Sequence, residues 1–273
     1  MNIRSIDPRL LVGEGILLAL AAVALGAGML FPGDPQSMVA QPLLAPGAQA
    51  AHPLGTDMLG RDVAAGLAHG ARATLLIGVV STVFAVVVGG LIGVLSGYFG
   101  GWVDNVLGKI TELFQTVPPI ILVIALTVVL GPSIRSMMIA IAAVSWPPIA
   151  RLARGEVLAL REREFIEACT AVGMTHGRII LRHVLPNIAP PILITISIVV
   201  ATSILIESGL SFLGLGDSNV TTWGGMIGAG REMIRTEWQL TAIPGTAIML
   251  TVLALNFVAE ALSEGRDPRL ALG

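Results

Sequence analysis

The chain has 273 residues, of which 54% are hydrophobic and 12% are charged, and its mean hydropathy is +0.84. A typical soluble domain carries about 25% charged residues, so this composition predicts a protein embedded in lipid. The net charge of -2 excludes the clustered basic surface that nucleic-acid binding requires, and the single cysteine, Cys169, excludes an intrachain disulfide framework.

Six apolar runs are long enough to be membrane-spanning helices, the form in which a chain pairs all its backbone polar groups inside a bilayer. The expected spans are residues 13–31, 73–95, 113–130, 136–151, 188–207 and 240–262. The fourth is short, but Met137 to Ile149 is almost wholly apolar, and a neighbouring helix or a thinned bilayer would accommodate the mismatch. The sequence therefore predicts an all-α membrane protein with six transmembrane helices.

The first span has an alternative interpretation as a secretory signal, because Arg4 and Arg9 precede a run rich in leucine and alanine. We expect the segment to be retained as a helix. The number of spans is then even, and both termini lie on the same side of the membrane.

Lysine and arginine are distributed unequally between the two sides of these spans, and the richer side is expected to be cytoplasmic. Eleven of the sixteen lie on the side of the termini: Arg4, Arg9, Lys109, Arg151, Arg154, Arg161, Arg163, Arg178, Arg182, Arg266 and Arg269. The other side has Arg61, Arg72, Arg135, Arg231 and Arg235. Residues 1–12 and 263–273 are thus expected to be cytoplasmic tails, and residues 73–262 a five-helix core with a cytoplasmic loop at 152–187. Residues 32–72 and 208–239 are expected to face outward.

Glycine, proline and aromatic residues give packing signals within the spans. Gly89, Gly93 and Gly97 recur at every fourth position, which predicts a helix face that another backbone approaches closely. Each of three proline pairs is expected to mark a helix start or a kink: Pro118-Pro119, Pro147-Pro148 and Pro190-Pro191. Four aromatic residues are expected at the membrane interfaces: Tyr98 and Trp102 on one side, and Trp223 and Trp238 on the other.

Ionisable groups are nearly absent from the predicted spans, although such groups mark ion and proton pathways in membrane proteins. Glu207, near the outer end of the fifth span, is a candidate for the substrate pathway, together with Ser211 and Asn256. The alternative for Glu207 is an interfacial carboxylate that pairs with a neighbour. A self-sufficient proton-coupled or sodium-coupled carrier is expected to carry more charge inside the membrane.

The sharpest pattern lies in the cytoplasmic loop, where residues 161–186 read REREFIEACTAVGMTHGRIILRHVLP. Phe165, Ala168, Cys169 and Val172 have the spacing of one apolar helix face, and Gly173 permits a sharp turn after it.

A second short helix is expected after this turn, with Ile179, Ile180 and Val184 on one face and an end at Pro186. Two short amphipathic helices in a bend form a compact knob. The spacing alone leaves three placements open: packed on its own membrane domain, flat on lipid, or docked in a groove of a soluble partner.

Glu167, Ala168 and Cys169, followed by Gly173 and by Leu185-Pro186, resemble the EAA loop of ABC importer permeases. The family pattern is EAA, three residues, G, nine residues, I, one residue, L, P. Cys169 replaces the second alanine, and His183 stands where isoleucine is usual.

Further segments resemble the dipeptide, oligopeptide and nickel permeases of this family. They are HPLGTDMLGRDV at 52–63, HGARATL at 69–75, ESGLSFLGLG at 207–216 and WGGMI at 223–227. Their order and spacing are more specific than any single motif. Within the family the chain is similar to the C-type subunit, which pairs with a homologous B-type permease.

The resemblance implies a type I ABC importer permease fold, in a bacterial cytoplasmic (inner) membrane, with a coupling helix that inserts into the ATPase. It implies two ATP-binding-cassette subunits that bind ATP and magnesium, an extracytoplasmic substrate-binding protein, contact with membrane lipid, and no cofactor in this chain. The expected coupling residues are Glu167, Ala168, Cys169, Gly173, Met174, His176, Ile179, Ile180, Arg182, Leu185 and Pro186. Short peptides are the expected substrate, with nickel chelates, glutathione, opines and oligosaccharides as alternatives.

Catalytic and metal-binding motifs are missing from the sequence. Lys109 follows Gly108, but Val103 and Ile110 occupy positions where a phosphate-binding P-loop needs glycine and serine or threonine. Neither a GxSxG elbow nor an HExxH motif occurs, and the four histidines lack compact ligand spacing. The sequence predicts a non-catalytic transport subunit, against two alternatives: a self-sufficient carrier or channel, and a membrane enzyme or assembly factor.

Overall fold

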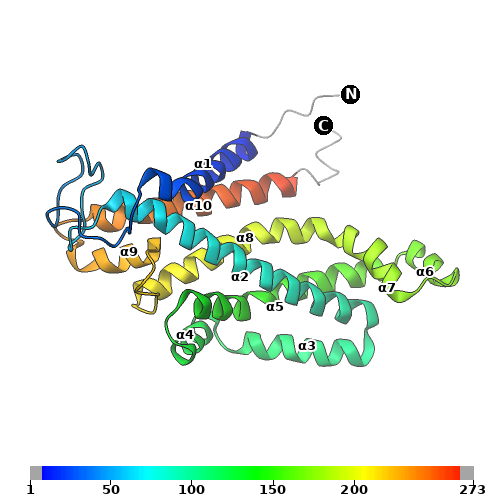
Figure 1. Cartoon of the computed structure of the whole chain (residues 1–273). Coiled ribbons are helices and arrows are strands. Elements are labelled where there is room, and N and C mark those ends of the chain that lie inside the picture. The colour runs from blue at the N-terminus through cyan, green and yellow to red at the C-terminus, as the bar shows by residue number, and fades with distance from the viewer. Residues whose placement is uncertain (1–7, 265–273) are drawn as a thin grey trace.

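A computed structural model describes residues 8–264 of the chain, and within this range the chain forms helices and no strands (Figure 1). Arg4, Arg266 and Arg269 lie outside the described residues, as does most of the two expected tails, 1–12 and 263–273.

Five long helices are apolar enough to cross a membrane. They are α1 (Pro8–Leu30), α2 (Val63–Phe99), α5 (Ile134–Arg161), α8 (Leu185–Phe212) and α10 (Gln239–Glu264). The sixth candidate crossing is the bent pair α3 (Gly101–Thr116) and α4 (Pro119–Leu130), which together meet the same criteria of length and composition. The predicted all-α membrane fold is confirmed, with five candidate crossings, or six when this pair counts as one.

The third crossing is not the single helix expected at 113–130. The chain bends by 86° between α3 and α4, and Val117 has extended backbone angles of φ -87° and ψ 129°. A residue that precedes a proline is pushed out of the helical region, and Pro119 then occupies the first turn of α4, where its missing N–H is harmless. Pro118-Pro119 is therefore a helix boundary, as expected, but it lies within the crossing.

The other two proline pairs do not end their helices. Pro147-Pro148 lies inside α5, which continues to Arg161 instead of ending near residue 151. Pro190-Pro191 lies inside α8, which is also longer than the expected 188–207. Each proline removes one backbone hydrogen bond, and packing against neighbouring helices in a membrane bundle compensates for this loss.

The closest helix contact joins α2 to α5 along the predicted glycine face. A Cβ atom on Gly89 would overlap the carbonyl oxygen of Trp146, and one on Gly93 would overlap that of Ala150. At Gly97 the added atom would lie 2.8 Å from the carbonyl oxygen of Arg154. The predicted glycine contact face is confirmed, and its partner is the backbone of α5.

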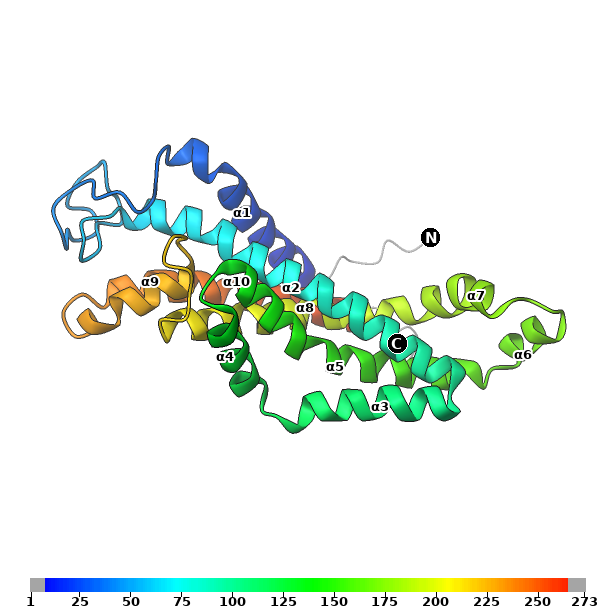
Figure 2. The same ribbon diagram turned by 60° about the horizontal axis from the view of Figure 1, so that its bottom comes forward.

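The remaining long helices pack around this pair. α1 lies beside α10, and both α1 and α8 also contact α2 (Figures 1 and 2). Gly13 sits against the backbone of α10, where an added Cβ would lie 2.8 Å from the carbonyl oxygen of Ala254. Ile204 of α8 is fully buried against this group of helices.

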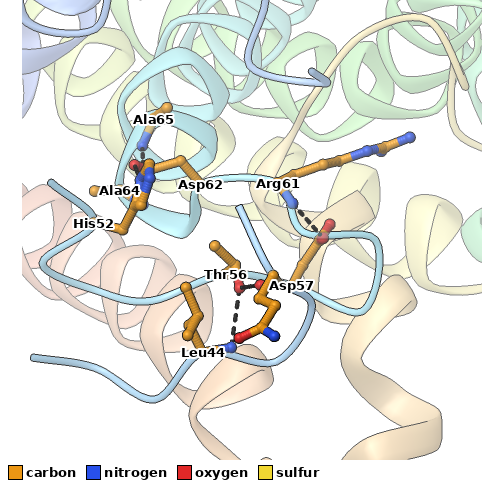
Figure 3. A network of polar contacts seen from close by, with 9 residues as sticks. Leu44, His52, Thr56, Asp57, Arg61, Asp62, Ala64 and Ala65 are labelled. Carbon is orange, nitrogen blue, oxygen red and sulfur yellow. Dashed lines mark hydrogen bonds and ion pairs between the residues drawn. The ribbon is translucent and has the colours of Figure 1, made fainter. Parts of the chain in front are cut away.

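The segment between α1 and α2 is folded rather than an open loop (Figure 3). Asp62 caps α2 by accepting hydrogen bonds from the amides of Ala64 (2.7 Å) and Ala65 (3.1 Å), and its other oxygen lies 2.6 Å from His52 Nδ1. Thr56 Oγ1 donates to the carbonyl oxygen of Gln41 at 2.6 Å. Because Asp62 caps the helix, α2 begins at Val63 and extends into the segment 32–72 that was expected to be a loop.

α9 (Trp223–Gly230) packs on α2 at the same end of the molecule. Trp223, expected at the membrane interface, is 1% exposed. Its indole nitrogen donates to the carbonyl oxygen of Leu67 (2.9 Å), and its backbone amide donates to Thr74 Oγ1 (3.1 Å). The ring is covered by this chain's own helices, so it does not face lipid, and its expected level at the membrane interface stays a prediction.

Replacement of Gly93 by alanine tests the α2–α5 contact. We expect Gly93→Ala to lower the unfolding free energy by about 1–3 kcal/mol, because the new methyl group overlaps the α5 backbone. Thermal unfolding of the purified protein in detergent measures the change.

Gly90→Ala is the matched control, since no atom lies within 4 Å of the position its Cβ would take. This variant should be neutral or slightly stabilising, because alanine favours a helix over glycine. Equal stability of the two variants would contradict the proposed backbone contact.

Candidate coupling element and pathway residues

A knob at the end of the molecule opposite α9 is formed by α6 (Glu164–Ala171), α7 (His176–Ile179) and a π-helical turn, Ile180–Val184 (Figures 1 and 2). Gly173 joins α6 to α7 with a φ of +79°, a conformation that side-chain-bearing residues rarely adopt. The predicted pair of short helices with a turn at Gly173 is confirmed. This part of the molecule is called the coupling element below.

The coupling element is anchored on the ends of α2 and α5. Ile166 of α6 and Ile179 of α7 are buried in one apolar cluster with Val94 of α2 and Val157 of α5. Tyr98 of α2 adds a polar contact, because its hydroxyl lies 3.0 Å from His176 Nδ1. The element is therefore packed on its own membrane domain and is not a free loop.

The apolar stripe predicted for α6 is mostly not the face that packs on the membrane domain. Ile166 is buried, whereas Val172 is 78% exposed and Phe165 is 41% exposed. Cys169 is half-buried at the edge of the cluster. Helical spacing identifies an apolar stripe but does not say which part of the molecule, or which partner, packs against it. The sequence analysis therefore missed Ile166 as the anchor.

The face predicted for the second short helix is correct, but its predicted end is wrong. Ile179 and Val184 are buried, and Ile180 packs against them. Pro186 does not stop the helix, because it follows the π-helical turn, where the α-helical hydrogen-bond pattern is already interrupted and the Leu185 amide donates to the carbonyl oxygen of Ile180. The chain is thus helical from His176 to Phe212.

The residues expected to couple to the ATPase fall into three groups by exposure. The exposed ones are Glu167, Ala168, Gly173, His176, Arg182, Leu185 and Pro186, the half-buried ones are Cys169, Met174 and Ile180, and Ile179 is buried. Ile179 thus supports the element, as does His176 through its contact with Tyr98, and the other exposed residues are accessible to a partner. Their coupling role remains a prediction.

Two of the three residues expected on the substrate pathway lie together. Glu207 is 0% exposed, and its carboxylate accepts hydrogen bonds from Ser211 Oγ (2.8 Å) and Ser208 Oγ (3.4 Å). Asn256 lies on an exposed part of α10. The structure joins Glu207 to Ser211 within α8 and leaves Asn256 apart, and their pathway role remains a prediction.

A charged pair that the sequence analysis did not single out connects α3 to α5. Arg154 donates to Asp104 from Nε (2.5 Å) and from Nη2 (2.6 Å), and Ser96 Oγ of α2 also donates to Asp104. Two parallel bonds of this kind fix geometry as well as adding energy. Arg154 is 50 residues from Asp104 in the sequence, so only the packing of α5 against α3 brings the two together.

A family model described as "Binding-protein-dependent transport system inner membrane component" matches residues 89–272. The dipeptide transport system permease protein DppC of Alkalihalophilus pseudofirmus is 36% identical over 262 residues, which cover 96% of this chain and 84% of that protein. The chain belongs to this permease family. The di/tripeptide transport system permease protein DppC of Pseudomonas aeruginosa is 35% identical over 94% of this chain and 87% of its own.

A solved structure supports the fold of the permease. A chain of the inward-facing MetNI methionine ABC transporter matches with a TM-score of 0.60 and 23% identity, over 73% of this chain and 95% of that one. The predicted type I ABC importer permease fold is confirmed. The protein is a multi-pass membrane subunit that forms part of the translocation pathway of an ABC importer.

Glu207 provides a test of whether a buried carboxylate serves stability or transport. We expect Glu207→Ala to lower the unfolding free energy by about 2–4 kcal/mol, because it leaves a cavity and removes the acceptor of the Ser211 hydroxyl. Glu207→Gln keeps an acceptor oxygen and should cost less than about 1 kcal/mol. Thermal unfolding in detergent measures both changes.

Substrate uptake separates the two roles of Glu207. A purely structural residue predicts normal uptake by the stable Glu207→Gln variant. A stable variant with much reduced uptake would instead support the pathway assignment.

Proposed function

We propose that this permease forms half of the translocation pathway of a bacterial importer of short peptides. A homologous permease forms the other half, two ATP-binding-cassette subunits drive the cycle, and an extracytoplasmic binding protein delivers the peptide. The observation that carries the proposal is a firmly anchored knob with an exposed EAA-type surface in a chain 36% identical to a dipeptide permease.

The coupling element has the properties of a handle. One side is buried against α2 and α5, while the other presents apolar side chains to solvent, including Phe165, Val172 and Leu181. Exposed apolar groups on a rigid element are characteristic of a docking site for another protein. We propose that this exposed side sits in a cleft of an ATPase subunit.

The element is connected to the membrane helices in a way that suits force transmission. α5 enters it after a helix of 28 residues, about 42 Å long, and α7 continues through the π-helical turn into α8. A displacement of the element therefore moves two crossings directly, without an intervening flexible loop. To shift the pathway from 1:99 to 99:1 between two states, nucleotide binding must favour one state by about 5.5 kcal/mol.

The proposal places ATP and magnesium in the partner subunits, and this chain has no catalytic role. The sequence lacks the P-loop that would hold phosphate groups. Closure of the two ATPases on ATP would draw the two coupling elements together and open the pathway toward the binding protein. Hydrolysis would then return the pathway to an inward-open state.

The proposed orientation places the coupling element and both termini in the cytoplasm, in the cytoplasmic (inner) membrane of a bacterium. Arg161, Arg163, Arg178 and Arg182 lie in or beside the element, and an excess of such residues is typical of cytoplasmic segments. The folded segment between α1 and α2 then faces outward together with α9, on the side from which the binding protein approaches.

Short peptides are the substrate class that the relatives support best. Two relatives are named for dipeptide or di/tripeptide transport, and the glutathione transport permease GsiD of Pectobacterium atrosepticum is 34% identical. Glutathione is itself a small peptide, so the relatives share a substrate with an amide backbone and charged termini. The ligand that co-purifies with the cognate binding protein will identify the substrate.

Reconstitution tests the whole proposal. The permease, its homologous partner and the ATPases in liposomes should import a labelled dipeptide when the loaded binding protein and ATP are supplied. ATP hydrolysis should rise when the loaded binding protein is added. Uptake by this chain alone, without ATP, would instead indicate a self-sufficient carrier.

A charge on the exposed side of the coupling element should release the ATPases. We expect Val172→Asp to weaken their retention by affinity-tagged permease at least about tenfold, because a carboxylate buried without a partner costs more than about 1.4 kcal/mol. Co-purification from detergent measures the retention.

Val39→Asp is the matched control, since Val39 is also exposed but lies between α1 and α2, at the opposite end of the molecule. The control should retain the ATPases. Full retention by Val172→Asp would show that this face is not the docking surface.

A further inference from the structure

α3 is amphipathic, although it lies beside long apolar helices. At 3.6 residues per turn its polar side chains share one half of the helix: Asp104, Asn105, Lys109, Glu112, Gln115 and Thr116. The other half holds Trp102, Val103, Val106, Ile110, Leu113 and Phe114. Such a helix has one side suited to water and one side suited to lipid or protein.

α3 extends from the coupling-element end of the bundle to about its middle. It lies alongside α2 and α5 (Figure 2). Asp104 is bonded to Arg154, and the ring of Phe114 packs 5.2 Å from that of Trp146, close to the middle of α5. Arg154 and Trp146 are about 12 Å apart along the helix axis. The polar side of α3 therefore continues well inside the length of the membrane-crossing helices.

A hollow of about 310 Å³ opens along this polar side, between α2, α3 and α5. Asn105, Lys109, Glu112 and Gln115 line it from α3, and Arg151 lines it from α5. The volume is at the lower end of the roughly 300–1,000 Å³ of small-molecule sites.

The charges in the hollow are only partly neutralised by one another. Asp104 and Arg154, which also line it, form an ion pair, whereas Lys109, Glu112 and Arg151 form no ion pair in the stretch that the structure describes, although the Glu112 carboxylate interacts with the Arg154 charge over a longer distance. The amide nitrogen of Gln115 is buried and has no hydrogen-bond partner there. Groups of this kind are satisfied by water or by a polar solute, which supply the hydrogen bonds and counter-charge that an apolar surrounding lacks. They lie toward the expected cytoplasmic end of the crossing helices, where the pathway would open to the cell interior.

We propose that the polar side of α3 forms the inner part of the peptide pathway and that this hollow holds a peptide in transit by both of its charged ends. Glu112 faces the ammonium group, and Lys109 and Arg151 face the carboxylate. This inference rests on the proposed peptide-importer function and adds the residues that contact the cargo. The presence of both signs of charge fits a zwitterionic peptide better than an anionic lipid headgroup, which Glu112 would repel.

Charge reversal in the reconstituted complex tests this inference. Uptake of three dipeptides, with net charges of -1, 0 and +1, is compared for the unmodified complex, Lys109→Glu and Glu112→Lys. The ratio of acidic to basic peptide uptake should fall about three- to tenfold in Lys109→Glu and rise by a similar factor in Glu112→Lys, as expected for charges a few ångströms apart in a hydrated site. The uptake ratio of each variant is divided by that of the unmodified complex, which cancels the binding protein's own preference among the three dipeptides.

Ile110→Ala is the matched control, because Ile110 neighbours Lys109 but lies on the apolar half of α3. It should leave the uptake ratio unchanged. If a reversed charge prevents assembly of the complex, Lys109→Gln and Glu112→Gln replace the two variants. They should shift the uptake ratio in the same directions by smaller factors. An unchanged ratio in variants whose ATP hydrolysis still responds to the loaded binding protein would overturn the inference and leave the proposed function standing. An unmodified complex without uptake would instead count against the proposed function.

Thiol labelling gives a second, independent measurement. In a Cys169→Ala complex, whose own uptake serves as the reference, Asn105→Cys should react with a membrane-impermeant thiol reagent, and transported peptide should slow the reaction at least about threefold. Leu113→Cys, on the apolar half of α3, should not be protected. An unreactive Asn105→Cys in the assembled complex would place this side of α3 in a subunit contact and overturn the inference.

Discussion

The backbone contact between α2 and α5 is the constraint on which the rest of the permease depends. In a bilayer, apolar side chains gain little by exchanging contacts with lipid for contacts with another helix. Membrane helices therefore associate through close packing and polar contacts. Gly89, Gly93 and Gly97 allow α2 to lie directly on the carbonyl groups of Trp146, Ala150 and Arg154. This approach sets the relative position of the two helices at every turn, and it carries Ser96 and Arg154 to the point where Asp104 of α3 binds both.

The same two helices support the coupling element. Val94 and Tyr98 directly follow Gly93 and Gly97 of the glycine contact on α2, and Ala153 and Val157 lie against the same two glycines from α5. The coupling element therefore rests on the most closely packed part of the bundle. Ile166 and Ile179 bury the inner side of the element there. A docking partner on the exposed side would therefore push against two joined helices rather than against a single flexible segment.

Polar groups in the bundle are divided between structural and solvent-facing positions. Glu207 and Ser211 satisfy each other in a fully enclosed site of α8, which ties the carboxylate to local packing. Asp104 and Arg154 also satisfy each other, and they hold α3 against α5. Lys109, Glu112 and Gln115 lie further along α3 and line the hollow. The ion pair of Asp104 and Arg154 thus holds in place the helix that presents these polar groups to a solute.

The sequence by itself determined the features that follow from local composition: the membrane-crossing helices, the glycine face of α2 and the turn at Gly173. It also carried the EAA pattern, which identifies a family without any knowledge of packing. Only the tertiary structure decided that Ile166 anchors α6 while Phe165 stays exposed, that Trp223 is buried, and that the third crossing bends and begins with an amphipathic helix. The physical reason is that a pattern of apolar or charged residues defines a face, whereas its partner depends on which distant helix packs against it.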